Sequence, residues 1–95
     1  IWIVEIKSSI EDYRSDSKWP DYRQHCDRLF FATHAGVPAD IFPQDCGLII
    51  ADEWSGHLLR EAPEHRLAAA TRKAMLLRFA RAAADRLLLA ELAAG

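Results

Sequence analysis

The sequence has few cysteines and few glycines for its length. Its 95 residues include two cysteines, Cys26 and Cys46, and no CxxC pair. A zinc site needs four ligands at closer local spacing, so we expect two buried thiols in a reducing cytosol. There is no glycine-rich phosphate loop and no nucleophile elbow, which disfavours nucleotide-binding folds and hydrolase triads.

Long apolar runs and a strong net charge are also missing. No run approaches the length of a bilayer span and nothing resembles a signal peptide, so we expect a cytoplasmic protein with no membrane contact. The net charge of −2 excludes a global attraction to nucleic acid. Residues 1–60 hold six Lys/Arg against ten Asp/Glu, and residues 61–95 hold six against four. An acidic first part with a basic end fits a nuclease, but it fits many other domains equally well.

What the chain does contain is the composition of one small globular domain. Hydrophobic residues make up 51% of it, which is too many for a disordered tail. At this length we expect residues 1–95 to form a single domain. Because Ile1 already lies inside a strand-like run, we also expect the N-terminal part of that domain to be missing.

Hydrophobic periodicity predicts an α/β protein. Four apolar runs are expected to be strands, at residues 1–7, 29–33, 47–51 and 57–60. Between them we expect a loop or short helix at 8–17, a helix from Pro20 to about Asp27, and a connection with one helical turn at 36–43. Residues 66–93 are expected to form one long helix or two in succession, with Gly95 as a stop. The first two strands flank a helical crossover and should be parallel or near neighbours, whereas the fourth should be antiparallel.

The first strand carries the chemistry. Period-two alternation divides its side chains between two faces, with Ile1, Ile3, Glu5 and Lys7 on one and Trp2, Val4 and Ile6 on the other. The β-branched and aromatic neighbours indicate a central, largely buried strand. Two charges on such a strand are costly unless they are paired or functional.

Glu5 and Lys7 are the candidate catalytic residues. Their Cα atoms should lie about 7 Å apart, so a metal ion and a phosphate fit between their side-chain ends. A divalent cation held by Glu5 and by the Ile6 carbonyl oxygen would activate water and polarise the phosphate. Lys7 would stabilise charge on the phosphate or help to deprotonate the water. The alternative is an ordinary charge pair on a strand face.

The sequence resembles a known family. The stretches IWIVEIKSSIEDYRSDSKWPDYRQHCDRLFFAT, VPADIFP and GLIIAD are similar to the MmcB-type DNA repair proteins of bacteria, and the combination of VEIKSS with KWPDYRQHCD is specific. These proteins are assigned to the PD-(D/E)xK nuclease-like superfamily. The similarity covers most of residues 1–60 and extends more loosely through the C-terminal helix.

The resemblance implies a restriction-endonuclease-like core, with a mixed sheet of about four strands flanked by helices and a long C-terminal helix. It implies Mg²⁺ (or Mn²⁺) dependence and action on DNA during repair. Glu5 matches the motif carboxylate and Lys7 the motif lysine. The further Asp of that superfamily, on a preceding strand, has no counterpart in this chain. Gln24 and Tyr22 do not match the superfamily's helical Gln and Tyr in order or spacing.

Other residues have both a structural and a functional interpretation. Ser8, Ser9 and Tyr22 are possible DNA-binding residues, but both serines also suit a capped turn. Trp19 is better explained as a core anchor than as a base-stacking platform. The basic side chains after residue 65 form either a solvated face or a DNA-backbone contact. The Leu/Ala stripe consists of Leu67, Ala70, Ala74, Leu77, Ala84 and Leu88, and it indicates core packing or, alternatively, the seam of a homodimer.

Three hypotheses follow. The first is a metal-dependent DNA endonuclease in DNA repair, with Glu5 on the metal and Lys7 at the phosphate. The second is a catalytically silent module with the same fold that binds DNA or a repair partner. The third is a structural domain in which Glu5 and Lys7 merely pair.

Overall fold

The computed structural model describes residues 1–94 and shows an α/β fold, as predicted. Its strands are β1 (Trp2–Ile6), β2 (Arg28–Thr33), β3 (Gly47–Ala51) and β4 (Gly56–Arg60). Its helices are α1 (Ile10–Ser15), α2 (Trp19–Tyr22) and α3 (Ala69–Ala94), with two 3₁₀ turns, η1 (Arg23–His25) and η2 (Ala39–Ile41). Gly95, the expected helix stop, lies outside the described residues.

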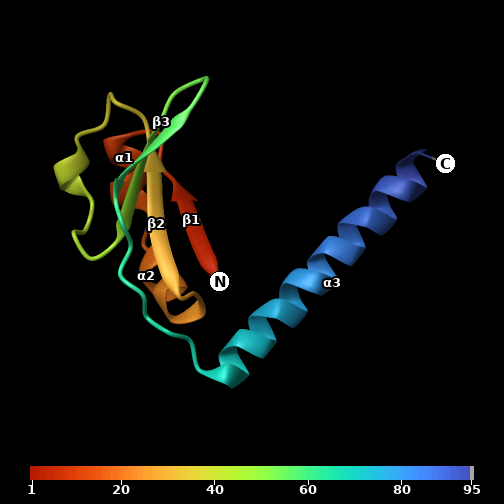
Figure 1. Cartoon of the computed structure of the whole chain (residues 1–95). Helices are drawn as coiled ribbons and strands as arrows, with labels where there is room; N and C mark the ends of the chain where they lie inside the picture. Colours follow the sequence, from red (N-terminus) through yellow and green to blue (C-terminus); the bar gives the residue numbers. More distant parts are fainter. Residues whose placement is uncertain (95) are drawn as a thin grey trace.

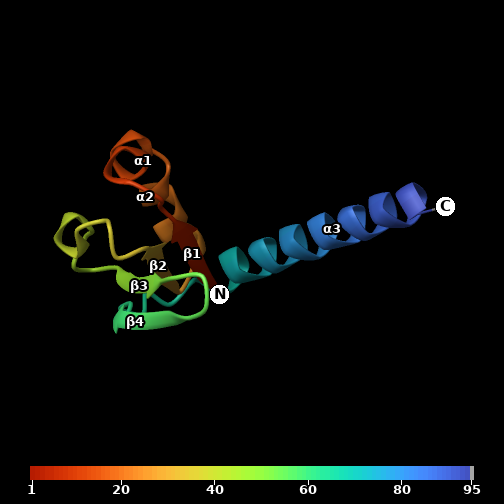
Figure 2. The same ribbon diagram turned by 90° about the horizontal axis from the view of Figure 1, so that it is seen from above.

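The strands form one mixed sheet in the order β1-β2-β3-β4 (Figures 1 and 2). β1, β2 and β3 are parallel, because long connections separate them in the sequence, and β4 is antiparallel to β3. A tight turn makes this last reversal. In it, the Asp52 carboxylate accepts hydrogen bonds from the backbone N–H groups of Trp54 and Ser55, both at 2.7 Å. The predicted parallel pair and the predicted antiparallel hairpin are both confirmed.

The helix predicted from Pro20 to about Asp27 is shorter than expected. The α-helical part ends at Tyr22, and only the η1 turn continues to His25. Cys26 already has extended backbone angles, with φ −146° and ψ 160°. The chain straightens there because it is entering β2, so strand pairing overrides local helix propensity.

The core lies between the sheet and the segments α1, α2 and η2, which cover one of its faces (Figure 2). Phe31 of β2 is fully buried at its centre, with the Trp19 ring centroid 5.2 Å away and the Tyr13 ring centroid 5.5 Å away. Trp19 is therefore a core anchor, as expected. Cys26 and Cys46 are buried free thiols, which confirms that part of the prediction.

The other face of the sheet is open over β1, although Phe30 of β2 is buried on that same face. The exposure of β1 corrects the prediction of a central first strand. The alternation itself is confirmed, because Trp2, Val4 and Ile6 share the outer face. Their exposed fractions are 66%, 47% and 75%. Within the described part of the chain β1 is one of the two edge strands of the sheet. Apolar composition predicts that a strand can be buried, but its place in a sheet depends on which strands pair with it.

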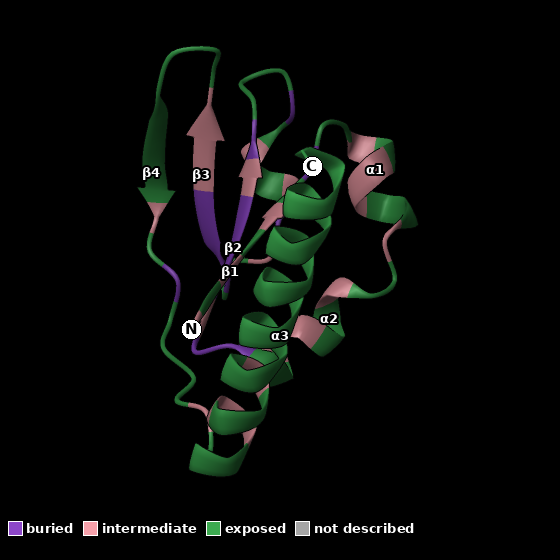
Figure 3. Cartoon of the chain, turned by 90° about the vertical axis from the view of Figure 1, so that its right-hand side faces the viewer, coloured by how far each residue is buried: buried purple, intermediate pink, exposed green. Residues whose placement is uncertain are grey.

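Helix α3 projects away from the sheet, and none of its described residues is buried (Figures 1 and 3). The expectation that its Leu/Ala stripe packs into the core of this chain is therefore wrong. Only the first half of the helix approaches the rest of the chain, near η1 and near the start of β1. The alternative of a homodimer seam stays a prediction. Among the described residues there is no helix that is both long and apolar enough to span a membrane.

Candidate functional site

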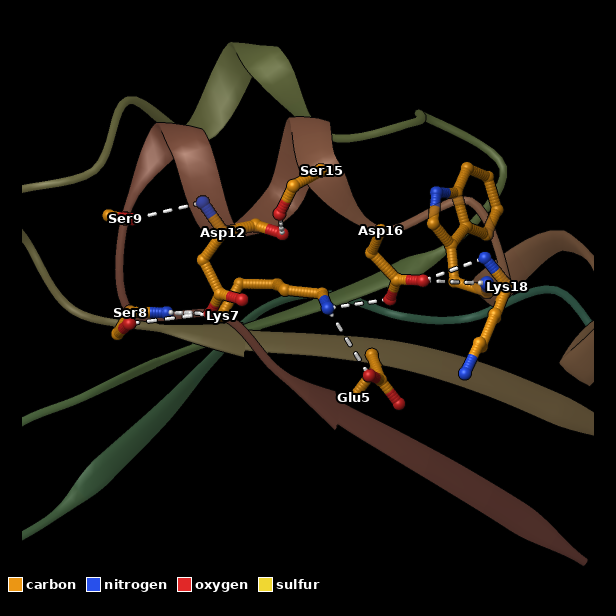
Figure 4. Close-up of polar contacts among 9 residues, drawn as sticks. Glu5, Lys7, Ser8, Ser9, Asp12, Ser15, Asp16 and Lys18 are labelled. Atoms are coloured by element: carbon orange, nitrogen blue, oxygen red, sulfur yellow. Dashed lines mark hydrogen bonds and ion pairs between the residues drawn. The ribbon is translucent and has the colours of Figure 1, made fainter.

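Lys7 follows the last residue of β1 and is only 5% exposed. Its Nζ atom lies 2.6 Å from Oδ2 of Asp16 and 3.3 Å from Oε1 of Glu5 (Figure 4). Glu5 and Lys7 reach the same side because they are two residues apart on a strand, on the face that α1 covers. The structure thus brings the two predicted catalytic residues together and adds a third.

Asp16 is the residue that sequence reasoning missed. It follows the last residue of α1, and its Oδ1 atom accepts hydrogen bonds from the backbone N–H groups of Lys18 at 2.7 Å and Trp19 at 3.3 Å. These bonds hold the carboxylate in the turn between α1 and α2. The sequence offered only the general signal of a polar segment, in which Glu11 and Asp12 are equally good candidates.

The charges of this cluster stabilise one another. Burial alone lowers the pKa of the Lys7 ammonium, but its hydrogen bonds to Asp16 and Glu5 and their negative charges outweigh burial and raise it. The hydrogen bond from Lys7 lowers the pKa of the Asp16 carboxyl. The formal charges of the two carboxylates and the ammonium sum to −1, so the cluster as a whole attracts a cation.

The Ile6 carbonyl points to the open edge of the sheet. Lys7 N–H donates to the carbonyl of Ala32 in β2 at 2.9 Å. Because a trans peptide holds its N–H and C=O in opposite directions, the carbonyl of Ile6 must face away from β2. That edge has no neighbouring strand among the described residues. Among the described residues no strand therefore uses the predicted metal-ligand carbonyl.

The end of β1 is tied firmly to the end of β2. Thr33 Oγ1 donates to the Lys7 carbonyl at 2.7 Å, and His34 Nε2 lies 2.7 Å from the Ser8 carbonyl oxygen. Gly36 N–H donates to His34 Nδ1 at 3.0 Å, so Nε2 carries the ring proton and donates it to Ser8. A shallow hollow of about 260 Å³ opens here, lined by Ile6, Lys7, Ser8, Ala32, Thr33, His34 and Ala51.

Ser8 and Ser9 are exposed but are engaged in the cap of α1. Ser9 Oγ accepts from Asp12 N–H at 3.0 Å, and Ser8 N–H donates to Asp12 Oδ2 at 2.9 Å. Tyr22 is half-buried beside Ile3 and Met75, near the start of α3. The structure therefore places both serines next to Lys7 and does not bring Tyr22 to that cluster.

The donor set fits a small hard cation. The Glu5 carboxylate and the Ile6 backbone carbonyl offer only oxygen ligands, which Mg²⁺ and Mn²⁺ prefer. No group of three or more His, Cys, Asp or Glu residues is positioned for a metal within residues 1–94. Mg²⁺ is usually held by one or two carboxylates, with water and substrate phosphate completing its shell.

A family model described as "DNA repair protein MmcB-like" matches residues 1–94. The chain belongs to this MmcB-like family. The match spans the Glu5–Lys7 strand, the Asp16 turn and α3, so the cluster and the long helix both lie within the part of the chain that the family model describes. The predicted family resemblance is confirmed.

A solved structure supports the fold. The chain is similar to the SPO1766 protein of unknown function from Silicibacter pomeroyi, with 44% sequence identity and a TM-score of 0.83. The similarity covers 90% of this chain and 59% of that one, so this MmcB-like chain spans little more than half the length of its relative. A search of curated proteins found no significant match.

Proposed function

We propose that this chain supplies the carboxylate and the lysine of a metal-dependent DNA endonuclease that acts in DNA repair. The observation that carries the proposal is the buried Lys7 ammonium beside Glu5 at the end of an edge strand, in a member of a DNA repair family. A buried lysine between carboxylates is costly to maintain for stability alone. Perturbed ionisable groups of this kind gather at functional sites.

The residues of the cluster have separate tasks in this proposal. Glu5 would hold Mg²⁺ or Mn²⁺ through its carboxylate, and Ile6 through its main-chain carbonyl. The chemistry that the ion supplies when bound is polarisation of the phosphate and activation of the attacking water. Lys7 would stabilise developing charge on the phosphate as a cation or help to deprotonate the water.

DNA contacts would come from exposed residues around this cluster. Ser8 and Ser9 lie beside Lys7 and can offer hydroxyl groups to a neighbouring phosphate. Tyr22 would contact DNA only at a distance from the cluster. Exposed basic side chains of α3 would add contacts to the DNA backbone, and these are Lys73, Arg78, Arg81 and Arg86.

A catalytically silent DNA- or partner-binding module is the second candidate. The observation in its favour is that Lys7 is engaged by both carboxylates, with no third acidic or His ligand gathered there in the part of the chain that the structure describes. Such a module would bind DNA equally well after loss of the Glu5 carboxylate.

The decisive experiment uses the full-length protein with Mg²⁺ or Mn²⁺ on plasmid, branched and damaged DNA. Glu5→Gln and Lys7→Met are expected to abolish cleavage and leave DNA binding in place. Glu11→Gln, an exposed substitution on α1, is the matched control and should cleave normally. Cleavage that survives both substitutions, or metal-independent cleavage, would contradict the proposal.

A further inference from the structure

The two carboxylates hold Lys7 unequally. Asp16 lies 2.6 Å from the ammonium, whereas Glu5 lies 3.3 Å from it. Asp16 is also fixed by two backbone N–H groups of the following turn. Glu5 makes no other side-chain hydrogen bond within the described residues, and its side chain is 24% exposed against 13% for Asp16. Glu5 is thus the partner that can turn away.

Turning Glu5 toward a cation has a consequence for Lys7. A buried ammonium that loses its only carboxylate is strongly destabilised, because neither water nor another charge replaces the lost partner. With Asp16 in place, the ammonium keeps a close partner throughout.

We propose that Asp16 is the permanent counter-ion of Lys7 and thereby frees Glu5 to bind the divalent cation. This inference rests on the proposed function, because it assigns a role within the same site. Asp16 is a positioning residue and not a metal ligand. Its Oδ1 atom serves Lys18 and Trp19, and its Oδ2 atom serves Lys7, so both oxygens are already engaged.

Mn²⁺ binding by the full-length protein tests this role, with isothermal titration calorimetry as the readout. Asp16→Asn keeps a side-chain oxygen that can accept the hydrogen bonds of the turn, but it removes the negative charge. Lys7 then has only Glu5 as a charged partner, so Glu5 is less free to bind the cation. We expect Mn²⁺ binding to weaken about tenfold, the order of one hydrogen bond to a charged group. In a Lys7→Met background, Asp16→Asn should have no further effect, because no ammonium remains to be neutralised. Glu11→Gln is the control and should bind Mn²⁺ normally.

The outcomes separate a counter-ion from its alternatives. Unchanged Mn²⁺ affinity in Asp16→Asn would overturn the inference. An equal loss with and without Lys7 would also overturn it, because Asp16 would then be a metal ligand. If Asp16→Asn alone fails to fold, the double variant with Lys7→Met should fold, since both members of the pair are gone. Misfolding of that double variant as well would contradict the counter-ion role.

Urea unfolding without metal gives an independent readout. Glu5→Gln should lower the unfolding midpoint less than Asp16→Asn, because Asp16 alone suffices for Lys7. Equal or reversed effects would overturn the inference. If these patterns hold while no DNA is cleaved, the proposed nuclease function fails and the role of Asp16 stands. If cleavage needs Glu5 and Lys7 but tolerates Asp16→Asn, the proposed nuclease function stands and the role of Asp16 fails. A wild-type protein that binds no Mn²⁺ overturns both.

Discussion

Arg72 and Asp27 form a two-point ion pair that fixes the start of α3. Arg72 Nη1 lies 2.7 Å from Oδ2 of Asp27, and Nη2 lies 2.7 Å from Oδ1. Asp27 Oδ1 also accepts the backbone N–H of Leu67 at 2.9 Å. Because α3 has no buried residue within the described range, this two-point pair is a strong polar link between the helix and the rest of the chain.

This pair predicts a pH dependence of stability. The hydrogen bonds from Arg72 hold the pKa of Asp27 far below its ordinary value of 3.8. An acid with a depressed folded-state pKa stabilises the fold above its unfolded pKa and loses that contribution as pH falls. Urea midpoints should therefore fall as pH drops below about 4, the unfolded pKa of Asp. Arg72→Met should lower the urea midpoint at neutral pH. It should also reduce the further fall of the midpoint at acid pH. Arg81→Met, on an exposed turn of α3, should do neither. If the midpoint of Arg72→Met falls with acid pH as steeply as that of the wild type, the Asp27–Arg72 pair is not the source of the pH dependence.

Local patterns were sufficient to predict the strands and the shared face of Glu5 and Lys7. Alternation is a property of the strand backbone itself, so it needs no knowledge of the rest of the chain. Asp16 is different. Which acidic residue of the segment reaches Lys7 depends on how α1 docks on the sheet, and Glu11, Asp12 and Asp16 cannot be distinguished before that packing is known.

Long-range pairing explains the two corrected predictions. An apolar strand such as β1 suits the centre of a sheet, but Trp2 and Ile6 remain exposed because no further segment among the described residues covers them. The stripe that includes Leu77 and Leu88 suggests burial, yet both of these side chains are exposed within the described part of the chain. Composition indicates which surfaces can be buried and not whether a partner surface is present.

Truncating a side chain should change the stability of the fold much more on the covered face of the sheet than on the exposed edge of the other face. Phe31 is fully buried, with the Phe42 ring centroid 5.2 Å away, so Phe31→Ala should leave a cavity and cost about 3–5 kcal/mol of unfolding free energy. Ile6→Ala, on the exposed outer face, should change it by less than about 0.5 kcal/mol. Urea denaturation of both variants measures the difference. Similar losses would mean that the outer face is covered in solution.

Two glycines of the β3–β4 hairpin, Gly47 and Gly56, should respond differently in stability when each is replaced by alanine. A Cβ at Gly47 would overlap the Phe30 ring, at 2.6 Å from Cε1, and would lie 3.0 Å from the Ala62 methyl group. Gly47→Ala should therefore destabilise the fold by about 1–3 kcal/mol through overpacking. Gly56→Ala meets nothing closer than 3.6 Å and should be neutral or slightly stabilising. Thermal unfolding compares them, and equal Tm values for the two variants would count against this packing.

The exposed basic side chains of α3 predict the salt dependence of DNA binding. If Arg78, Arg81 and Arg86 contact DNA phosphates, replacing all three with Gln should weaken binding at low salt, because fewer counterions are then released from the DNA. The slope of log K against log salt should become shallower by about 0.9 for each phosphate that is no longer neutralised. Fluorescence anisotropy with duplex DNA across a salt series measures this slope. Arg14→Gln, exposed on α1, is the single-charge control. An unchanged slope in the triple variant would mean that these arginines form a solvated face. The DNA contacts would then come from the part of the chain that forms the sheet, where Glu5 and Lys7 lie.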